Sequence, residues 1–165
     1  MAILKSNMCE FISNSADQTR RLGMRLGSLM ELQSVICLSG NLGAGKTTFV
    51  QGLAAGWGST DPVNSPTFVL INQYERISGG TLYHMDAYRV ANSFEAEELD
   101  LELMVDKGVL VVEWPERIDD VLPRERLWVN LEYVSEDKRR FSFKPAGNYY
   151  EELITTFQKR SFGGL

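Results

Sequence analysis

The chain of 165 residues contains little of what metal centres, disulfide scaffolds and histidine-based catalysis require. It has two cysteines, Cys9 and Cys37, and a single histidine, His84. The cysteines lie far apart in the sequence and form no metal-binding or redox motif, which is typical of a reduced, cytoplasmic protein. One histidine cannot build a multi-histidine metal site, and a Ser-His-Asp triad would have to be built around His84 itself.

Long hydrophobic runs and strong positive charge are also missing. No apolar run approaches the roughly 18 residues of a membrane-spanning helix, and the N-terminus is too polar for a signal-peptide core. The net charge is −5, and the only basic cluster, at 138–140, directly follows two acidic residues. We therefore expect no membrane partner and no general nucleic-acid binding through a basic surface, while a local contact at 138–140 stays open.

The remaining composition is that of an ordinary globular protein. Hydrophobic residues make up 44% of the chain and charged residues 24%, which is enough apolar material for a sizeable core. No repeat, low-complexity tract or linker divides the sequence. A chain of this length fits one domain, so we predict a single domain over 1–165.

Apolar periodicity and turn residues predict the order α-β-α-β-β-α-β-β-β-α. A capping-box signature at Ser15 and Gln18 begins the first helix, and Gly56 and Gly58 are interpreted as stops of the second. The predicted helices cover about 15–31, 47–58, 93–104 and 148–160, and the predicted strands cover about 35–40, 67–75, 81–86, 108–114, 127–134 and 139–145. This order predicts an α/β fold with a mostly parallel central sheet, added antiparallel strands and helices on both faces.

A glycine-rich stretch, LSGNLGAGKTTF at 38–49, carries the spacing G-x-x-x-x-G-K-[ST] between a predicted buried strand and a predicted helix. Its glycines let the backbone curl so that N–H groups point at phosphate oxygens, and the helix N-terminus adds further donors. Lys46 is predicted to reach the outer phosphates and Thr47 to bind Mg²⁺. The predicted nucleotide-binding residues of this loop are Asn41, Leu42, Gly43, Ala44, Gly45, Lys46, Thr47 and Thr48.

Two strands are predicted to end in carboxylates. The apolar run GVLVVE ends at Glu113, and the strand at 81–86 ends at Asp86. Because ligands bind at the carboxyl edge of open α/β sheets, we predict a metal or metal-supporting role for Glu113. Asp86 is a candidate for positioning water or supporting the metal, with a simple turn residue as the alternative. His84 is expected to be a packed strand residue rather than a ligand.

Two further residues are candidates for responding to the nucleotide. Thr67 lies in NSPT, after the loop helix, where nucleotide switches place a threonine that senses the γ-phosphate; an ordinary strand start explains it equally well. Trp114 follows Glu113 and is either a core residue or an indole that reports nucleotide binding.

Several nucleotide-handling motifs are absent. The chain has no [NT]-K-x-D guanine-selecting motif and no D-x-x-G at the spacing of a GTPase, so ATP is the expected nucleotide. It also has no Arg-rich lid of the kind that clamps an acceptor in small-molecule kinases. These absences favour a small ATPase with a switch loop and little room for a large second substrate.

Four motifs in order, GNLGAGKTT at 40–48, NSPTF at 64–68, HMDAYR at 84–89 and VEWPE at 112–116, resemble the TsaE (YjeE) family. That family is the ATPase of bacterial transfer-RNA threonylcarbamoyladenosine synthesis, and the resemblance covers about 15–145. It implies a three-layer P-loop NTPase fold and slow ATP hydrolysis until the protein docks on TsaB and TsaD. It also implies that hydrolysis resets the TsaB–TsaD complex, which modifies adenosine-37 of ANN-decoding tRNAs, so that tRNA is reached only through these partners.

The resemblance also implies roles for particular residues. Thr47 and Glu113 correspond to Mg²⁺ positions, Asp86 to the catalytic or water-positioning acid, and Trp114 to a residue near the nucleotide. The base pocket corresponds to about Ala16 and Lys138. The family commonly has a carboxylate at the first of these positions, so a contact at Ala16 would use its backbone.

Two other classes of function remain open from the sequence. A small phosphotransferase would pass the γ-phosphate of ATP to a metabolite or hydroxyl. A non-hydrolysing adaptor would use ATP binding only to assemble a complex. The catalytic residues predicted for the ATPase are Lys46, Asp86 and Glu113, and which acid positions the water stays open.

Overall fold

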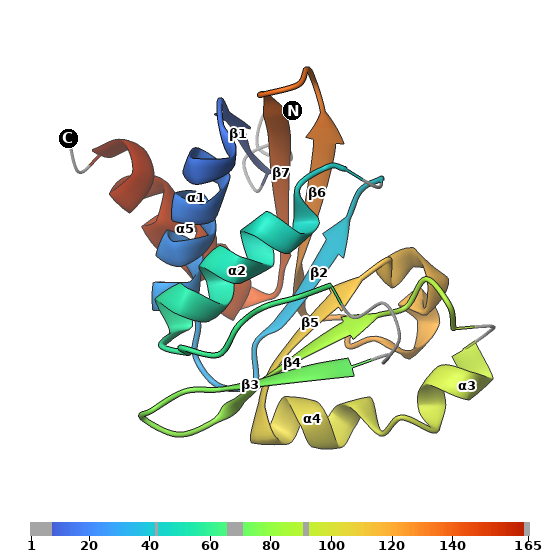
Figure 1. Ribbon diagram of the computed structural model, residues 1–165. Helices are drawn as coiled ribbons and strands as arrows, with labels where there is room; N and C mark the ends of the chain where they lie inside the picture. The colour runs from blue at the N-terminus through green and yellow to red at the C-terminus, as the bar shows by residue number, and fades with distance from the viewer. Residues whose placement is uncertain (1–7, 42, 66–70, 91–92, 164–165) are drawn as a thin grey trace.

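The computed structural model describes residues 8–41, 43–65, 71–90 and 93–163, which form a seven-stranded sheet with helices on both faces (Figure 1). The strands are β1 (Cys9–Ser13), β2 (Val35–Ser39), β3 (Ile71–Glu75), β4 (Thr81–Asp86), β5 (Gly108–Glu113), β6 (Arg126–Tyr133) and β7 (Arg139–Ala146). Their order in the sheet is β1-β7-β6-β2-β5-β4-β3. The central strands β6, β2, β5 and β4 are parallel neighbours, whereas β1, β7 and β3 pair antiparallel. The predicted α/β class with a parallel centre and antiparallel additions is confirmed.

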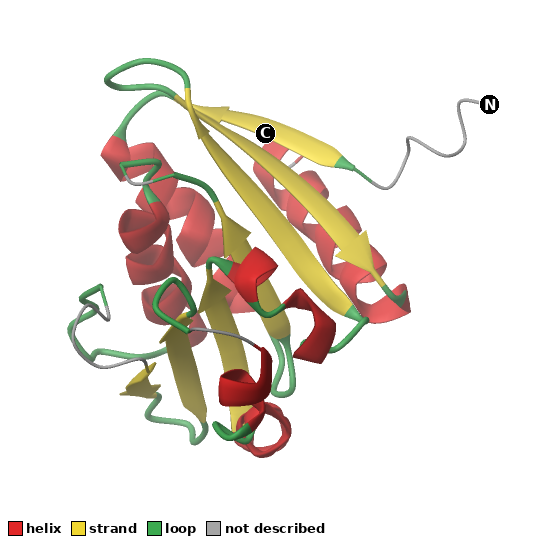
Figure 2. Cartoon of the chain, turned by 90° about the vertical axis from the view of Figure 1, so that its right-hand side faces the viewer, coloured by secondary structure: helices red, strands yellow, loops and turns green. Residues whose placement is uncertain are grey.

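The helices divide into two groups, one on each face of the sheet (Figures 1 and 2). They are α1 (Ala16–Leu29), α2 (Lys46–Trp57), α3 (Ser93–Glu97), α4 (Leu101–Lys107) and α5 (Asn148–Gln158), with short helical turns at Pro115–Arg117, Asp119–Val121 and Lys159–Gly163. One face is covered by α1, α2 and α5, and the other by α3 and α4. None of the helices in the described ranges has both the length and the apolar character needed to cross a membrane.

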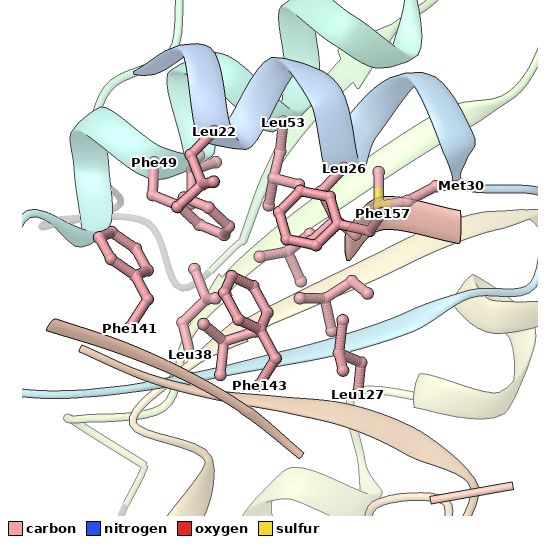
Figure 3. Close-up of a cluster of buried hydrophobic side chains, with 14 of the residues drawn as sticks. Leu22, Leu26, Met30, Leu38, Phe49, Leu53, Leu127, Phe141, Phe143 and Phe157 are labelled. Carbon is pink, nitrogen blue, oxygen red and sulfur yellow. The ribbon is translucent and has the colours of Figure 1, made fainter. Parts of the chain in front are cut away.

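The larger hydrophobic core lies between the sheet and the helices α1, α2 and α5. Figure 3 shows its main side chains, which are Leu22, Leu26, Met30, Leu38, Phe49, Leu53, Leu127, Phe141, Phe143 and Phe157. A smaller core covers the opposite face, beneath α3 and α4. Because both faces of the central sheet are covered, every residue of β5 is buried, which explains its continuous apolar run.

Three details differ from the sequence-based expectation. β1 was not predicted, because its five residues alternate between buried and exposed within a polar segment and gain their place only by pairing with β7. The prediction of one helix at 93–104 is wrong, because the structure has two helices there, α3 and α4. Asp100 adopts a left-handed backbone (φ 55°) between them. Gly56 does not stop α2, which continues to Trp57 and ends at the left-handed Gly58 (φ 109°).

Helices α1 and α2 touch backbone to backbone. Gly23 and Gly27 lie one turn apart on α1, and Gly52 and Gly56 lie one turn apart on α2. A Cβ atom added at Gly27 would lie 2.2 Å from the carbonyl oxygen of Leu53, and additions at the other three glycines would also meet the facing backbone. This contact holds α2, and with it the loop that precedes α2, against α1.

Candidate nucleotide-binding site

The glycine-rich loop joins the end of β2 to the start of α2. Gly40, Gly43 and Gly45 have φ angles of 151°, 79° and 100°, a region that glycine enters without steric cost. Gly45 is the N-cap of α2, and among the described residues no side chain caps its first turn. The N–H groups at this helix end are therefore available to an anion, as the sequence motif predicts.

Lys46 is the first residue of α2, and its side chain reaches back to the glycine-rich loop. Its side chain is buried, and its Nζ donates hydrogen bonds to the carbonyl oxygens of Gly40 and, at 3.2 Å, of Asn41. The same Nζ lies 4.5 Å from the centre of the Trp114 ring. Burial lowers the pKa of Lys46, and the negative charge of Glu113 opposes that shift. Lys46 is thus a desolvated cation held between the loop and the strand ends.

Asp86 and Glu113 are brought together at the carboxyl edge of the sheet. They occupy the last positions of the parallel neighbours β4 and β5, directly opposite each other, and Leu38 of β2 lies opposite Glu113 on the other side. Burial raises the pKa of Asp86, with Glu113 adding to the shift and the N–H of Tyr88, which donates to Asp86 at 2.9 Å, opposing it. The two acids therefore face the end of the glycine-rich loop, as predicted from the strand ends.

His84 has contacts that sequence reasoning missed. It is fully buried on β4, and its Nε2 lies 2.5 Å from Oε2 of Glu113. Its Nδ1 lies 3.0 Å from the hydroxyl of Tyr74, and that hydroxyl donates to the carbonyl oxygen of Asn64 at 3.2 Å. The alternation of β4 indicates that His84 and Asp86 share a face, but the bond to Glu113 depends on pairing between strands far apart in sequence.

A cavity of about 340 Å³ lies between the glycine-rich loop and the two strand-end acids. It is lined by Asn41, Gly43, Gly45, Lys46, Thr47, Thr48, Ser65, Asp86, Glu113, Trp114 and Arg139. Ala44 is buried beneath the loop. The predicted residues Leu42 and Thr67 lie outside the described residues. Residues of the glycine-rich loop, both strand-end acids and Trp114 therefore line the same cavity.

The residues predicted for the base pocket, Ala16 and Lys138, are both exposed, and neither is among the described residues that line this cavity. Their role in base binding stays a prediction. Arg139, next to Lys138, lines the cavity, and its Nε is buried without a hydrogen-bond partner among the described residues. Its Nη1 donates to the carbonyl oxygens of Ser135, Glu136 and Lys138. The alternation at the start of β7, which turns Arg139 inward, is the signal that could have identified it.

Trp114 adopts an unusual backbone beside the cavity. Its φ of 58° lies in the left-handed region, which is rare for a bulky side chain and is found most often at functional sites. Its N–H donates to the carbonyl oxygen of Leu38 at 3.2 Å, and its ring centre lies 5.0 Å from that of Tyr88. This conformation turns the chain immediately after Glu113 and keeps the indole next to Lys46.

The residues around the cavity fit a nucleotide with Mg²⁺. Thr47, Asp86 and Glu113 supply hard oxygen donors, and Lys46 and Arg139 supply cations for phosphate. In the described part of the chain no group of three or more His, Cys, Asp or Glu residues could hold a metal ion alone. A metal here would share its coordination with hydroxyl, water and phosphate oxygens, which is the usual arrangement for Mg²⁺ in nucleotide sites.

Comparison with known proteins places the chain in one family. The family model described as "Threonylcarbamoyl adenosine biosynthesis protein TsaE" matches residues 13–141. The chain belongs to the TsaE family. The family predicted from the four motifs is thereby confirmed.

The alignment with TsaE relatives covers most of this chain and most of each relative. The tRNA threonylcarbamoyladenosine biosynthesis protein TsaE of Bacillus subtilis is 41% identical over 140 residues, covering 83% of this chain and 85% of the relative. That of Treponema pallidum is 40% identical over 133 residues, covering 79% and 96%. The crystal structure of YdiB from Bacillus subtilis superposes with a TM-score of 0.80 at 31% identity, covering 93% of this chain and 96% of that chain.

Proposed function

We propose that this chain is a partner-activated, Mg²⁺-dependent P-loop ATPase that acts in tRNA threonylcarbamoyladenosine synthesis. The observation that carries the proposal is that the glycine-rich loop at 40–45 faces Asp86 and Glu113 across one cavity, with Lys46 between them. Membership of the TsaE family supports the pathway. The proposal treats 1–165 as one ATPase domain in the cytoplasm.

The loop and the start of α2 bind the phosphates of ATP. Backbone N–H groups at 41–48 donate to phosphate oxygens, and Lys46 exchanges its loop carbonyl partners for the outer phosphates. Thr47 and Glu113 hold Mg²⁺, which neutralises negative charge that develops on the phosphates. Arg139 lines the same cavity and supplies a second cation for the phosphates.

Asp86 orients the attacking water. The backbone N–H of Tyr88 fixes its carboxylate, and burial with the nearby charge of Glu113 raises its pKa. A carboxylate with a raised pKa is a better base, so Asp86 is suited to hold and accept a proton from water that attacks the γ-phosphate. Glu113 is already hydrogen-bonded by His84, which favours the metal role for it.

The partners in this proposal are TsaB and TsaD, and hydrolysis resets their complex between turnovers. A net charge of −5 favours a protein that reaches tRNA only through partners. The segment 59–68 is the proposed switch and docking surface, because Ser65 lines the cavity and its position can follow the nucleotide. Thr67 is the proposed phosphate sensor of this segment.

The test measures phosphate release from ATP with and without TsaB and TsaD. The expected result is slow release that the partners stimulate strongly, and loss of nucleotide binding in Lys46→Ala because the central cation is removed. Absence of stimulation would remove partner activation from the proposal, and full activity in Lys46→Ala would remove the loop from the mechanism.

Two further outcomes separate the alternative functions. Transfer of label from γ-labelled ATP to a metabolite in a cell extract, instead of release as free phosphate, would identify a phosphotransferase. Multiple turnovers of tRNA modification supported by Asp86→Ala that does not hydrolyse ATP would identify an adaptor. We expect neither, because Asp86→Ala should bind ATP and support no repeated modification.

A further inference from the structure

A chain of buried polar side chains crosses three neighbouring strands beside the cavity. Tyr74 on β3, His84 on β4 and Glu113 on β5 are 3%, 0% and 4% exposed, and these strands are adjacent in the sheet. All three belong to the face that α2 covers, where their neighbours Leu82 and Val111 are core residues. Burial of polar groups is costly unless each finds a hydrogen-bond partner, so such a chain is fully connected or destabilising.

The contacts link a loop at one end to a carboxylate at the other. The loop carbonyl of Asn64 accepts from the Tyr74 hydroxyl at 3.2 Å, and that hydroxyl lies 3.0 Å from Nδ1 of His84. Nε2 of His84 then lies 2.5 Å from Oε2 of Glu113. Asn64 and Glu113 thus lie at the two ends of one hydrogen-bonded path.

One end of this path lines the nucleotide cavity, and the other end is next to a residue that lines it. Glu113 lines the cavity directly, and Asn64 precedes Ser65, which lines it from the loop at 59–65. The same loop is held to β3 by Asp61, whose carboxylate accepts from the N–H of Glu75 at 2.7 Å. A shift of the loop would therefore change the contact between Asn64 and the Tyr74 hydroxyl.

The hydroxyl of Tyr74 has one proton for two neighbours. An ionised Glu113 and the carbonyl of Asn64 can only accept hydrogen bonds, so Nε2 of His84 carries a proton and the hydroxyl donates either to Asn64 or to Nδ1. Asn64 keeps a second donor, Nδ2 of Asn72 at 3.1 Å, if the hydroxyl turns away. Donation to Nδ1 therefore satisfies every group of the path, whereas donation to Asn64 leaves Nδ1 of a neutral His84 without a donor.

We propose that His84 is a positioning residue for Glu113 and that Tyr74 couples this position to the loop at 59–65. The inference rests on the proposed function, because it assigns Glu113 to the metal of a bound nucleotide. His84 holds Oε2, so the other carboxylate oxygen of Glu113 would be the one to bind the metal. Hydrogen-bonded partners of this kind orient metal-binding carboxylates and commonly contribute tenfold or more to affinity. The loop thereby influences the metal site through Tyr74 and His84.

The test measures Mn²⁺ affinity by electron paramagnetic resonance in the presence of a non-hydrolysable ATP analogue. In His84→Asn the amide reaches only the former Nδ1 position, so the contact with Glu113 is lost. In His84→Gln the amide reaches the Nε2 position and retains it. We expect His84→Asn to lose about tenfold or more in Mn²⁺ affinity and His84→Gln to stay near wild type. Affinity for the nucleotide without metal should be unchanged in both.

Tyr74→Phe tests the connection to the loop, because it keeps the ring and removes only the hydroxyl. In the wild type, metal and nucleotide should slow hydrogen exchange of the loop at 59–65, and this response should be reduced in Tyr74→Phe. The matched control is Tyr150→Phe, which removes another buried hydroxyl that accepts from the N–H of Val35 at 2.8 Å. Tyr150→Phe should lower the melting temperature and leave Mn²⁺ affinity unchanged.

The outcomes separate this inference from the function on which it rests. A wild-type chain that binds no nucleotide or Mn²⁺ would overturn the proposed function, and this inference with it. A wild-type chain that binds both, with His84→Asn equal to wild type or His84→Gln as weak as His84→Asn, would overturn the positioning role alone. An unchanged loop response in Tyr74→Phe would overturn the coupling.

Discussion

The glycine-rich loop has two supports that differ in kind. On the helix side, the interface between α1 and α2, backbones meet so closely that a Cβ at Gly27 would lie 2.2 Å from the oxygen of Leu53. On the strand side, the ends of β4 and β5, Asp86 and Glu113 are brought next to Lys46 in a cavity. The helix side is built for close packing, whereas the strand side retains charged groups that packing alone would exclude.

The two sides differ in what their residues do to stability: the helix side packs closely, and the strand side buries charged groups. Burial disfavours the charged forms of both Lys46 and Asp86, as their shifted pKa values indicate. Such perturbed groups cluster at functional sites, because a ligand of the right charge relieves them. The helix side needs no ligand and holds the loop in place, while the strand side presents the charged groups that the proposed nucleotide would contact.

The largest expected effect is that of Gly27→Val on the helix side. The added side chain must push the backbone of Leu53 away, so the free energy of unfolding should fall by about 3 kcal/mol or more. Urea denaturation measures it, with Ser28→Val on the exposed face of the same helix as the control. Equal stability of the two variants would mean that the close approach of the helices contributes little.

On the strand side, Asp86→Asn should stabilise the ligand-free protein near neutral pH while abolishing turnover. Burial and Glu113 raise the pKa of Asp86, and an amide oxygen can still accept from the N–H of Tyr88. Thermal unfolding measures the gain, with the exposed Glu116→Gln as a control that should show no comparable change.

The sign of the pH dependence follows from the raised pKa. The cost of the ionised Asp86 is full above its folded-state pKa and is relieved as the pH falls through that value toward about 3.9, the value in an unfolded chain. The advantage of Asp86→Asn should therefore be largest near neutral pH and shrink in acid. A destabilised variant at neutral pH would contradict this account.

The smallest expected effect belongs to the cap of α1. The Oγ of Ser15 accepts from the N–H of Gln18 at 3.1 Å, so Ser15→Ala should cost about 1 kcal/mol in urea denaturation. Ser15→Asp supplies another capping oxygen and should restore most of the loss. A loss as large as that of Gly27→Val would show that the helix end, rather than the glycine contact, dominates this side.

The sequence was most informative where one segment carries its own signal. The loop spacing at 40–47 and the buried runs of β2 and β5 predicted the centre of the sheet and the acids at its edge. Ser15 and Gln18 predicted the start of α1, and Ser15 accepts from the N–H of Gln18 as the motif requires. These features depend on neighbours a few residues away, so local patterns contain them.

Features that depend on tertiary contacts were not predictable in the same way. The bond between His84 and Glu113 requires the pairing of β4 with β5, whose residues are far apart in the sequence. The sequence around Gly56 suggests a helix end, because glycines that allow helices to pack closely and glycines that end helices look alike in sequence. The left-handed Asp100 has no local signal of its own.

At position 114, the residue that suits the backbone conformation differs from the residue that suits the cavity. Glycine would adopt its φ of 58° without strain, yet glycine has no ring to place 4.5 Å from Nζ of Lys46. The residue that suits the main chain best is therefore the one that suits the cavity least. Selection for thermal stability alone would favour glycine or asparagine at position 114, so a screen for more stable variants should enrich substitutions that remove the indole from Lys46.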